Sequence, residues 1–207
     1  MVKRTFVYID GFNLYYGCLN GTPYKWLDLA KLCQALLPSD NVIAIKYFTA
    51  KVAGRPSDPD APIHQELYLR ALGTLPNVTI TYGQFLTHKV YMPISGSNPT
   101  RWAYVDKTEE KGSDVNLATY LLHDGFTGMY DIAVIISNDS DLREAVRVVR
   151  EVLQKPVGII NPHSRHSKEL QEFATFKKRI RERHLAASQF PDELTDGNGT
   201  FHKPQFR

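Results

Sequence analysis

The chain is predicted to fold as an α/β protein, a three-layer α/β/α sandwich around a mostly parallel sheet, with a small β-hairpin insertion. Two observations lead to this prediction. Strand patterns alternate with helix patterns along most of the chain, which favours parallel strands joined by crossover helices. The segment 132–136 is a continuous apolar run, as expected of a central strand that is buried on both faces.

The first part of the chain supplies three strands and two longer helices of this sandwich. A short apolar strand at 5–9 is followed by Gly11, which permits a tight turn, and by a short helix from Asn13. Leucines at roughly helical spacing predict a helix over 27–37 that Pro38 ends. The remaining predictions are strands at 41–49 and 78–82 and a helix at 62–72.

Residues 84–111 differ from the alternating pattern. Two strand-like stretches, 85–93 and 101–108, flank the turn-rich sequence Ser-Gly-Ser-Asn-Pro at 95–99. We therefore expect a hairpin-like insertion that lies beside the main sheet.

The last part of the chain returns to strands and helices and then changes in composition. We expect helices at 114–123 and 141–153, strands at 132–136, 156–160 and 173–176, and a helical or extended basic stretch at 177–184. Pro, Asp, Gly, Asn and Thr dominate from residue 188. The predicted organisation is one domain over 1–187 and a disordered C-terminal tail over 188–207.

Composition limits the class of protein. With 207 residues and 43% hydrophobic content, the chain can bury the core of one domain. The net charge of +3 is compatible with a polyanionic partner. Because there is no signal-peptide pattern and no apolar stretch long enough to span a membrane, we expect a cytoplasmic protein with no membrane partner. Cys18 and Cys33 form no metal-ligand pattern.

Four acidic residues follow strand-like segments or open helical ones. Asp10 ends the first strand, Asp114 follows Lys-Gly-Ser at a helix start, and Asp139 and Asp141 follow the strand at 132–136. Carboxylates that converge at strand ends repel one another unless a cation lies between them. The pattern predicts a site for Mg²⁺ or Mn²⁺, which would serve a metal-dependent phosphodiesterase. Asn13, one turn after Asp10, would turn its amide oxygen toward the same crevice and orient a water.

Each of these residues also has a structural explanation, because aspartate and serine commonly cap helices. Asp10 could form a turn, Ser113 could cap the helix that begins near Asp114, and Asp139 or Ser140 could cap the helix from Leu142. Other chemistries have less support. The sequence contains no HExxH or CxxC spacing for zinc, no GxGxxG, no P-loop and no Ser-His-Asp order.

Basic and aromatic residues offer a surface for nucleic acid. Lys177, Lys178, Arg179, Arg181 and Arg183 place five positive charges in seven residues, and Lys111 lies near Asp114. These would contact phosphates, although such a run also fits a solvated helix face. Tyr15, Tyr16, Tyr91, Trp102 and Tyr104 could stack on bases, but most are expected to pack in the core or the hairpin.

Three motifs resemble the NYN domain, a family of the PIN-like nuclease superfamily. They are Tyr-Ile-Asp-Gly-Phe-Asn-Leu at 8–14, Lys-Gly-Ser-Asp-Val-Asn-Leu-Ala at 111–118 and Ser-Asn-Asp-Ser-Asp-Leu at 137–142, and the resemblance covers 5 to about 176. It implies a PIN-like fold, Mg²⁺ or Mn²⁺, and RNA cleavage by metal-activated water. Asp10, Asp114 and Asp139 match the metal cluster, Asp141 an accessory acidic position and Asn13 a conserved polar one. Ser-Asn replaces the Ser-Gly of many members.

The sequence therefore predicts a metal-dependent endoribonuclease that acts on single-stranded or structured RNA. Asp10, Asn13, Asp114, Asp139 and Asp141 are the predicted catalytic residues, and the resemblance adds a homodimer as an expectation. A non-catalytic RNA-binding or regulatory adaptor on a nuclease-like fold is the alternative, since some family members have only regulatory roles. A DNA flap nuclease would share the metal chemistry. An aspartyl phosphatase would require a second carboxylate near Asp10 that the segment 10–13 lacks.

Overall fold

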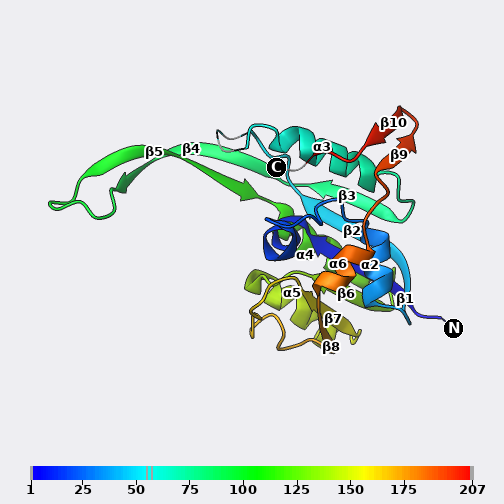
Figure 1. Ribbon diagram of the computed structural model, residues 1–207. Coiled ribbons are helices and arrows are strands. Elements are labelled where there is room, and N and C mark those ends of the chain that lie inside the picture. Colours follow the sequence, from blue (N-terminus) through cyan, green and yellow to red (C-terminus); the bar gives the residue numbers. More distant parts are fainter. Residues whose placement is uncertain (1, 55, 57, 206–207) are drawn as a thin grey trace.

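The core of the protein is a parallel sheet of six strands (Figure 1). The computed structural model describes residues 2–54, 56 and 58–205. Every pair of neighbouring strands in the sheet is parallel, so their carboxyl ends share one edge. In spatial order the strands are β3 (Val78–Tyr82), β2 (Asn41–Thr49), β1 (Arg4–Asp10), β6 (Ile132–Ile136), β7 (Val157–Asn161) and β8 (Phe176–Arg179).

Helices cover both faces of this sheet, which makes the predicted three-layer α/β sandwich. One apolar core joins the sheet to α1, η1, α2, α3 and α6, and a second joins it to α4, α5 and η3. The bounds are α1 (Gly11–Leu14), the π-helical turn η1 (Tyr15–Leu19), α2 (Leu29–Leu36), α3 (Ala61–Leu72), α4 (Ser113–Phe126), the 3₁₀ turn η2 (Ser140–Leu142), α5 (Arg143–Arg147), the π-helical turn η3 (Val148–Val152) and α6 (Glu182–Ala187). No described helix is long and apolar enough to cross a membrane.

The order of the strands fixes where a ligand crevice can form. The chain builds β1, β2 and β3 outward in one direction and then returns to place β6 on the other side of β1. In open α/β sheets the crevice lies at the carboxyl ends of the strands on either side of such a reversal. The ends of β1 and β6 are therefore the expected site, and they carry Asp10 and the segment that contains Asp139.

The predicted hairpin forms, but it does not lie beside the main sheet. Strands β4 (Gln84–Pro93) and β5 (Trp102–Lys111) pair only with each other over ten residue pairs. Figure 1 shows them as a long twisted ribbon that extends away from the body of the protein. We call β4, β5 and their connecting turn the arm. The backbone groups on the outer sides of the arm are free of any sheet neighbour, so the insertion is a separate two-stranded element.

The final strand of the sheet lies later than the sequence predicted. We expected a strand at 173–176, but β8 runs from Phe176 to Arg179. The backbone of Gly158 in β7 lies so close to the Phe176 ring that a Cβ atom there would come within 2.2 Å of it. This close contact sets the register of β8, and the basic residues that follow are tolerated because β8 is an edge strand.

The C-terminal segment is ordered over its described residues, contrary to the predicted disorder from residue 188. Strands β9 (Glu193–Asp196) and β10 (Gly199–His202) form a second hairpin, and residues 206–207 lie outside the described part. Phe190 and Phe201 are buried in the core, and Asp196 accepts two hydrogen bonds from Arg70 at 2.7 Å each. Two buried rings and one ion pair thus fix a segment whose composition is mostly polar.

Candidate metal centre

Asp10 lies at the carboxyl end of β1 and is buried. One of its carboxylate oxygens accepts a hydrogen bond from the backbone N–H of Asn13 at 2.9 Å, which caps α1. The other accepts from the Ser137 hydroxyl at 3.0 Å. Burial raises the pKa of Asp10, these two hydrogen bonds oppose the rise, and the negative charges of Asp139 and Glu110 add to it. Asp10 thus caps α1 and also faces other carboxylates, so the structural role does not exclude a role in the acidic site.

Asp114 reaches the same place from the first turn of α4. The residue before the helix, Gly112, has φ of 97°, a left-handed conformation that favours glycine. The Glu110 side chain accepts a hydrogen bond from the N–H of Ser113 at 3.1 Å, so Glu110 rather than Ser113 caps the helix start. Desolvation, followed by the charges of Asp10 and Asp139, raises the pKa of Asp114 to about 7.

Asp139 lies in the loop after β6 and caps the short turn η2. Its carboxylate accepts a hydrogen bond from the N–H of Asp141 at 2.9 Å, while its own N–H donates to the Ser137 hydroxyl at 3.1 Å. The Ser137 hydroxyl therefore contacts both Asp10 and the backbone of Asp139. One buried serine thus joins the carboxyl ends of β1 and β6.

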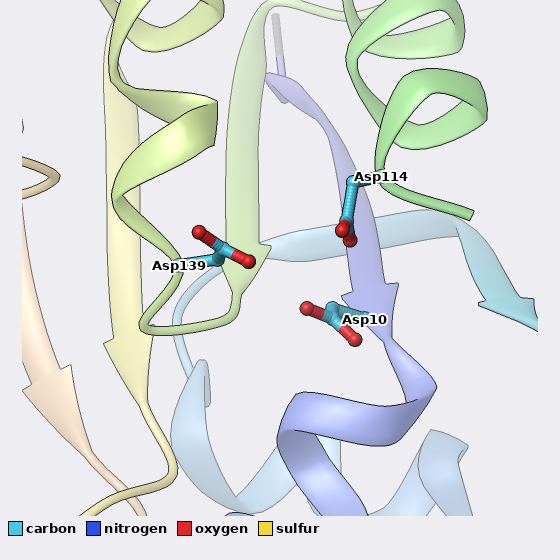
Figure 2. A group of neighbouring side chains, drawn as sticks. All are labelled: Asp10, Asp114 and Asp139. Carbon is cyan, nitrogen blue, oxygen red and sulfur yellow. The ribbon is translucent and has the colours of Figure 1, made fainter. Parts of the chain in front are cut away.

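The three carboxylates converge on one space. Ligand oxygens of Asp10, Asp114 and Asp139 all lie within 4.8 Å of one another, and Figure 2 shows the three side chains directed toward a common centre. No basic side chain of the described residues forms an ion pair with any of the three. Oxygen donors of this kind suit a divalent metal ion, whose positive charge would offset the repulsion among the three carboxylates.

A network of polar side chains holds the loops around this centre, and Asn13 belongs to it. The amide oxygen of Asn13 accepts from the N–H of Asn138 at 2.9 Å and lies 3.0 Å from the Nε2 atom of His163. The amide oxygen of Asn138 in turn accepts from the N–H of Ser167. The oxygen that we expected to orient a water is thus engaged with the loops after β6 and β7, which gives Asn13 a positioning role.

Sequence reasoning missed three residues of this arrangement, namely Ser137, His163 and Glu110. Ser137 had a readable signal, since it directly follows the apolar strand and precedes Asp139 by two residues. Glu110 also lies only four residues before Asp114 in the sequence. His163 is 150 positions from Asn13, and only the pairing of β7 with β6 brings its loop to the site.

The three motifs around Asp10, Asp114 and Asp139 lie within the range of one family model. The model of the NYN domain matches residues 4–178. The chain belongs to the NYN domain family. That family is nuclease-like, and the three aspartates of this NYN domain form the acidic cluster described above.

Comparisons with individual proteins add one relative and one fold neighbour. The chain is 37% identical to a protein of Pseudomonas putida named 6-hydroxy-3-succinoylpyridine 3-monooxygenase HspA, over 91% of this chain and 70% of that protein. Among solved structures it is similar to a protein of unknown function from Vibrio parahaemolyticus, with a TM-score of 0.57 and 16% identity over 91% of this chain and 97% of the other. This second likeness concerns the fold alone.

Two further predicted residues lie at the rim of the NYN domain site. Asp141 is exposed, and its charge contributes to the raised pKa of Asp114. Lys111, predicted to contact a phosphate, is also exposed and forms an ion pair with Glu109 at 2.9 Å. Glu144, one turn into the following helix, pairs with Arg147 and is exposed.

The basic stretch 177–183 holds five of the six residues predicted to contact nucleic acid. They line a surface groove of about 520 Å³ between the C-terminal part of α2, β8 and α6, with His166 and His184 also at its wall. Lys178 donates a hydrogen bond to the carbonyl of Leu36 at 2.7 Å. The other four, Lys177, Arg179, Arg181 and Arg183, form no ion pair with any described carboxylate. Because the NYN domain match ends at residue 178, the arginines of this basic groove lie beyond it.

Proposed function

We propose that this protein is a metal-dependent endoribonuclease that hydrolyses phosphodiester bonds of RNA. The observation that carries the proposal is the convergence of Asp10, Asp114 and Asp139, from three separate segments of an NYN domain, within 4.8 Å. Helix capping explains one carboxylate at a time but gives no reason for three to face one another without a cation. Asp10, Asp114 and Asp139 would hold Mg²⁺ or Mn²⁺ through oxygen atoms.

The burial of each residue suits it to a different part of the proposed hydrolysis. A bound Mg²⁺ or Mn²⁺ would lower the pKa of a water, orient the phosphodiester and neutralise developing charge. Asp10 is buried and held by two hydrogen bonds, which suits a fixed ligand. Asp141 is exposed at the rim and would hold an outer water or accept its proton. Asn13 and Ser137 would keep the strand ends at the right separation.

The basic groove supports RNA as the substrate class. The strand pairs run from Ile9 through Ile136 and Ile160 to Lys178. Asp10 and Arg179 are each the next residue on their strands, so they extend this row by one position. Three strand spacings separate the two positions, about 14 Å at about 4.8 Å per spacing. That distance corresponds to roughly four stacked nucleotides at about 3.4 Å each. A single RNA strand cleaved at the acidic cluster would thus reach the groove with its backbone phosphates.

The decisive experiment is cleavage of a mixed pool of labelled RNA and DNA with Mn²⁺, with Mg²⁺ and with chelator, using the native protein and Asp139→Asn side by side. We expect RNA cleavage that chelator and the substitution both abolish. Cleavage of DNA alone would reassign the substrate. Binding of RNA without any cleavage would favour the alternative, a non-catalytic RNA-binding or regulatory adaptor.

The role of the basic groove is tested separately from catalysis, by RNA binding in chelator on the Asp139→Asn background. Arg181→Glu with Arg183→Glu should weaken binding and reduce the slope of log affinity against log salt by about 1.4, since each lost phosphate contact on a single strand contributes about 0.7. Lys3→Glu with Arg150→Glu is the matched control, because both residues are exposed and the charge change is equal. Equal loss of binding in both proteins would show a general charge effect and remove the groove from the proposal.

The Pseudomonas relative supplies a second candidate function, oxygenation of a hydroxypyridine. Its support is the 37% identity to a protein that bears a monooxygenase name. The matching test is oxygen uptake with 6-hydroxy-3-succinoylpyridine and a reduced nicotinamide as electron donor. Substrate-dependent uptake that Asp139→Asn removes would favour this candidate over RNA hydrolysis.

A further inference from the structure

One face of the arm carries a cluster of exposed aromatic rings, which we call the aromatic platform: Tyr91, Trp102 and Tyr104. Tyr91 is paired with Tyr104 across the two strands, and Trp102 follows on the same face toward the tip. The Tyr91 ring stacks on Trp102 at 5.4 Å between ring centroids and lies 4.9 Å from Tyr104. Such pairs hold a ribbon together, but the three residues are still 57%, 51% and 74% exposed. The rings are therefore held in place and open to a ligand.

The charges around the aromatic platform suit a polyanion. Residues 87–105 include Lys89 and Arg101 and contain no aspartate or glutamate, whereas the carboxylates of the arm all lie at 106–110, toward its base. Neither Lys89 nor Arg101 forms an ion pair with a carboxylate in the described part of the chain. An apolar protein surface would leave both cations without a counterion. Single-stranded nucleic acid instead supplies phosphates for the cations and bases that stack on the rings.

The arm and the basic groove lie on opposite sides of the acidic cluster (Figure 1). A single residue, Gly83, joins β3 to the arm, and the groove lies along β8, so the two start from the outermost strands of the sheet. Strands β1 and β6, whose carboxyl ends position Asp10 and Asp139, lie at the centre. An endonuclease has to hold its substrate on both sides of the bond that it cleaves. The basic groove provides such a contact on one side only.

The base of the arm contacts the acidic cluster through the same face that carries the aromatic platform. Glu110 lies on this face and caps the start of α4 beside Asp114. Phe85, which is paired with Glu110, packs against the ring of Phe12 at 5.7 Å, just after Asp10 in the chain. This face therefore leads from the cluster toward the tip of the arm.

We propose that the aromatic platform binds the bases of single-stranded RNA on one side of the acidic cluster, while the basic groove binds phosphates on the other side. The inference rests on the proposed RNA substrate and selects single strands, because a double helix keeps its bases stacked inside. The segment of β5 from Tyr104 to Glu110 is about 20 Å long at about 3.4 Å per residue. The platform would thus hold bases roughly six stacked nucleotides from the cleaved bond, at about 3.4 Å per nucleotide.

The first test is RNA affinity in chelator on the Asp139→Asn background, with a labelled single-stranded RNA of about 20 nucleotides, which is long enough to span the groove and the platform. Trp102→Ala/Tyr104→Ala should weaken binding roughly 10-fold to 100-fold, as expected when stacked bases lose their aromatic partners. The slope of log affinity against log salt should stay unchanged, because no charge is removed. This result would separate the platform from the groove, since substitutions in the groove reduce the slope.

Leu86→Ala/Val105→Ala is the matched control, because these two exposed residues lie on the opposite face of the same arm and carry no ring. This variant should keep the native affinity. Native affinity in the Trp102→Ala/Tyr104→Ala protein would overturn the inference and leave the face to a protein partner. Equal losses in the two variants would also overturn it, because the fold of the arm rather than its rings would then determine binding.

The fluorescence of Trp102 tests the contact without any substitution in the arm. Trp26, the other tryptophan of the chain, is fully buried, so a change on adding RNA reports on Trp102. RNA should quench this emission in chelator, whereas an abasic oligomer of the same length should bind through its phosphates without quenching. Equal quenching by both oligomers, or none by bound RNA, would contradict stacking on the platform.

Cleavage of the same RNA with Mn²⁺ separates this inference from the proposed function. If the native protein cleaves the RNA and the ring substitutions leave its affinity unchanged, only the inference fails. If the platform binds RNA and no cleavage follows, the inference holds and the adaptor becomes the better function. A protein that binds no RNA would contradict both proposals.

Discussion

The acidic cluster and the arm carry opposite kinds of surface, yet each is unfavourable in the isolated chain. At the cluster, like charges are held together by a buried sheet edge and a hydrogen-bonded network, and burial, with the neighbouring charges adding to it, raises the pKa of Asp10 and of Asp114. In the arm, apolar side chains remain in water with only each other as neighbours. The first arrangement suits a divalent cation, whereas the second offers an apolar surface for contact.

The largest expected effect tests whether the acidic cluster is a catalytic centre. Asp10→Asn should reduce RNA cleavage by at least about 1000-fold, because a metal ion that stabilises transition-state charge contributes several kcal/mol. Asparagine can still accept the hydrogen bond from Asn13, so the fold should persist. The measurement is the rate of cleavage beside a circular dichroism spectrum. If the Asp10→Asn variant cleaved RNA at the native rate, Asp10 would not be a catalytic residue.

The second prediction compares the two tryptophans of the chain, one in the body and one on the arm. Trp26 is fully buried, donates a hydrogen bond to the Pro191 carbonyl and packs against Phe190. Trp26→Ala should cost about 3–5 kcal/mol of unfolding free energy, as is usual for a buried aromatic residue. Trp102→Ala should cost less than about 0.5 kcal/mol, because this side chain is 51% exposed on the arm. Equal losses in urea titrations would mean that the arm stabilises the monomer.

The third prediction concerns metal binding by the acidic cluster. Mn²⁺ at 100 times its dissociation constant should stabilise the native protein by about 2.7 kcal/mol, since a ligand that binds only the folded state shifts unfolding by mass action. Asp114→Asn should show less than half of this gain, because one carboxylate ligand is lost. Thermal unfolding with Mn²⁺ and with chelator gives both values. A gain that is the same in the two proteins would place the bound ion elsewhere.

The smallest expected effect is on the pH dependence of stability without metal. Burial and the neighbouring carboxylates raise the pKa of Asp114 to about 7 in the folded state, from 3.8 for an ordinary aspartate. Between these values the folded state holds a proton that the unfolded state has released, so stability falls as pH rises from about 4 to 7 and is then constant. Asp114→Asn lacks this loss. The variant should therefore gain on the native protein over that range, by less than about 1 kcal/mol after solvent screening.

The melting temperature of both proteins in chelator at pH 4, 6 and 8 tests this prediction. A difference that stays constant with pH would show that Asp114 does not titrate in this range. A variant that loses stability relative to the native protein as pH rises would mean that the carboxylates attract a cation from the protein itself, contrary to the ion pairs described above.

The sequence alone determined the sandwich, the hairpin and the three aspartates. Each depends on local patterns, namely apolar runs of the right length, turn residues, and carboxylates that directly follow strands or open a helix. Each of these patterns spans only a few residues, so it can be recognised without knowledge of the rest of the chain. The parallel order of the strands then makes convergence at one edge the expected outcome.

Only the tertiary structure decided how distant residues share that edge. The amide oxygen of Asn13 contacts the loops at Asn138 and His163, which lie 125 and 150 positions away in the sequence. The C-terminal hairpin is ordered because Phe201 enters a core built from much earlier residues. The arm leaves the sheet, although its sequence reads as ordinary strands. The hydrogen bonds of Asn13 and the burial of Phe201 depend on contacts across many sequence positions, which no local pattern encodes.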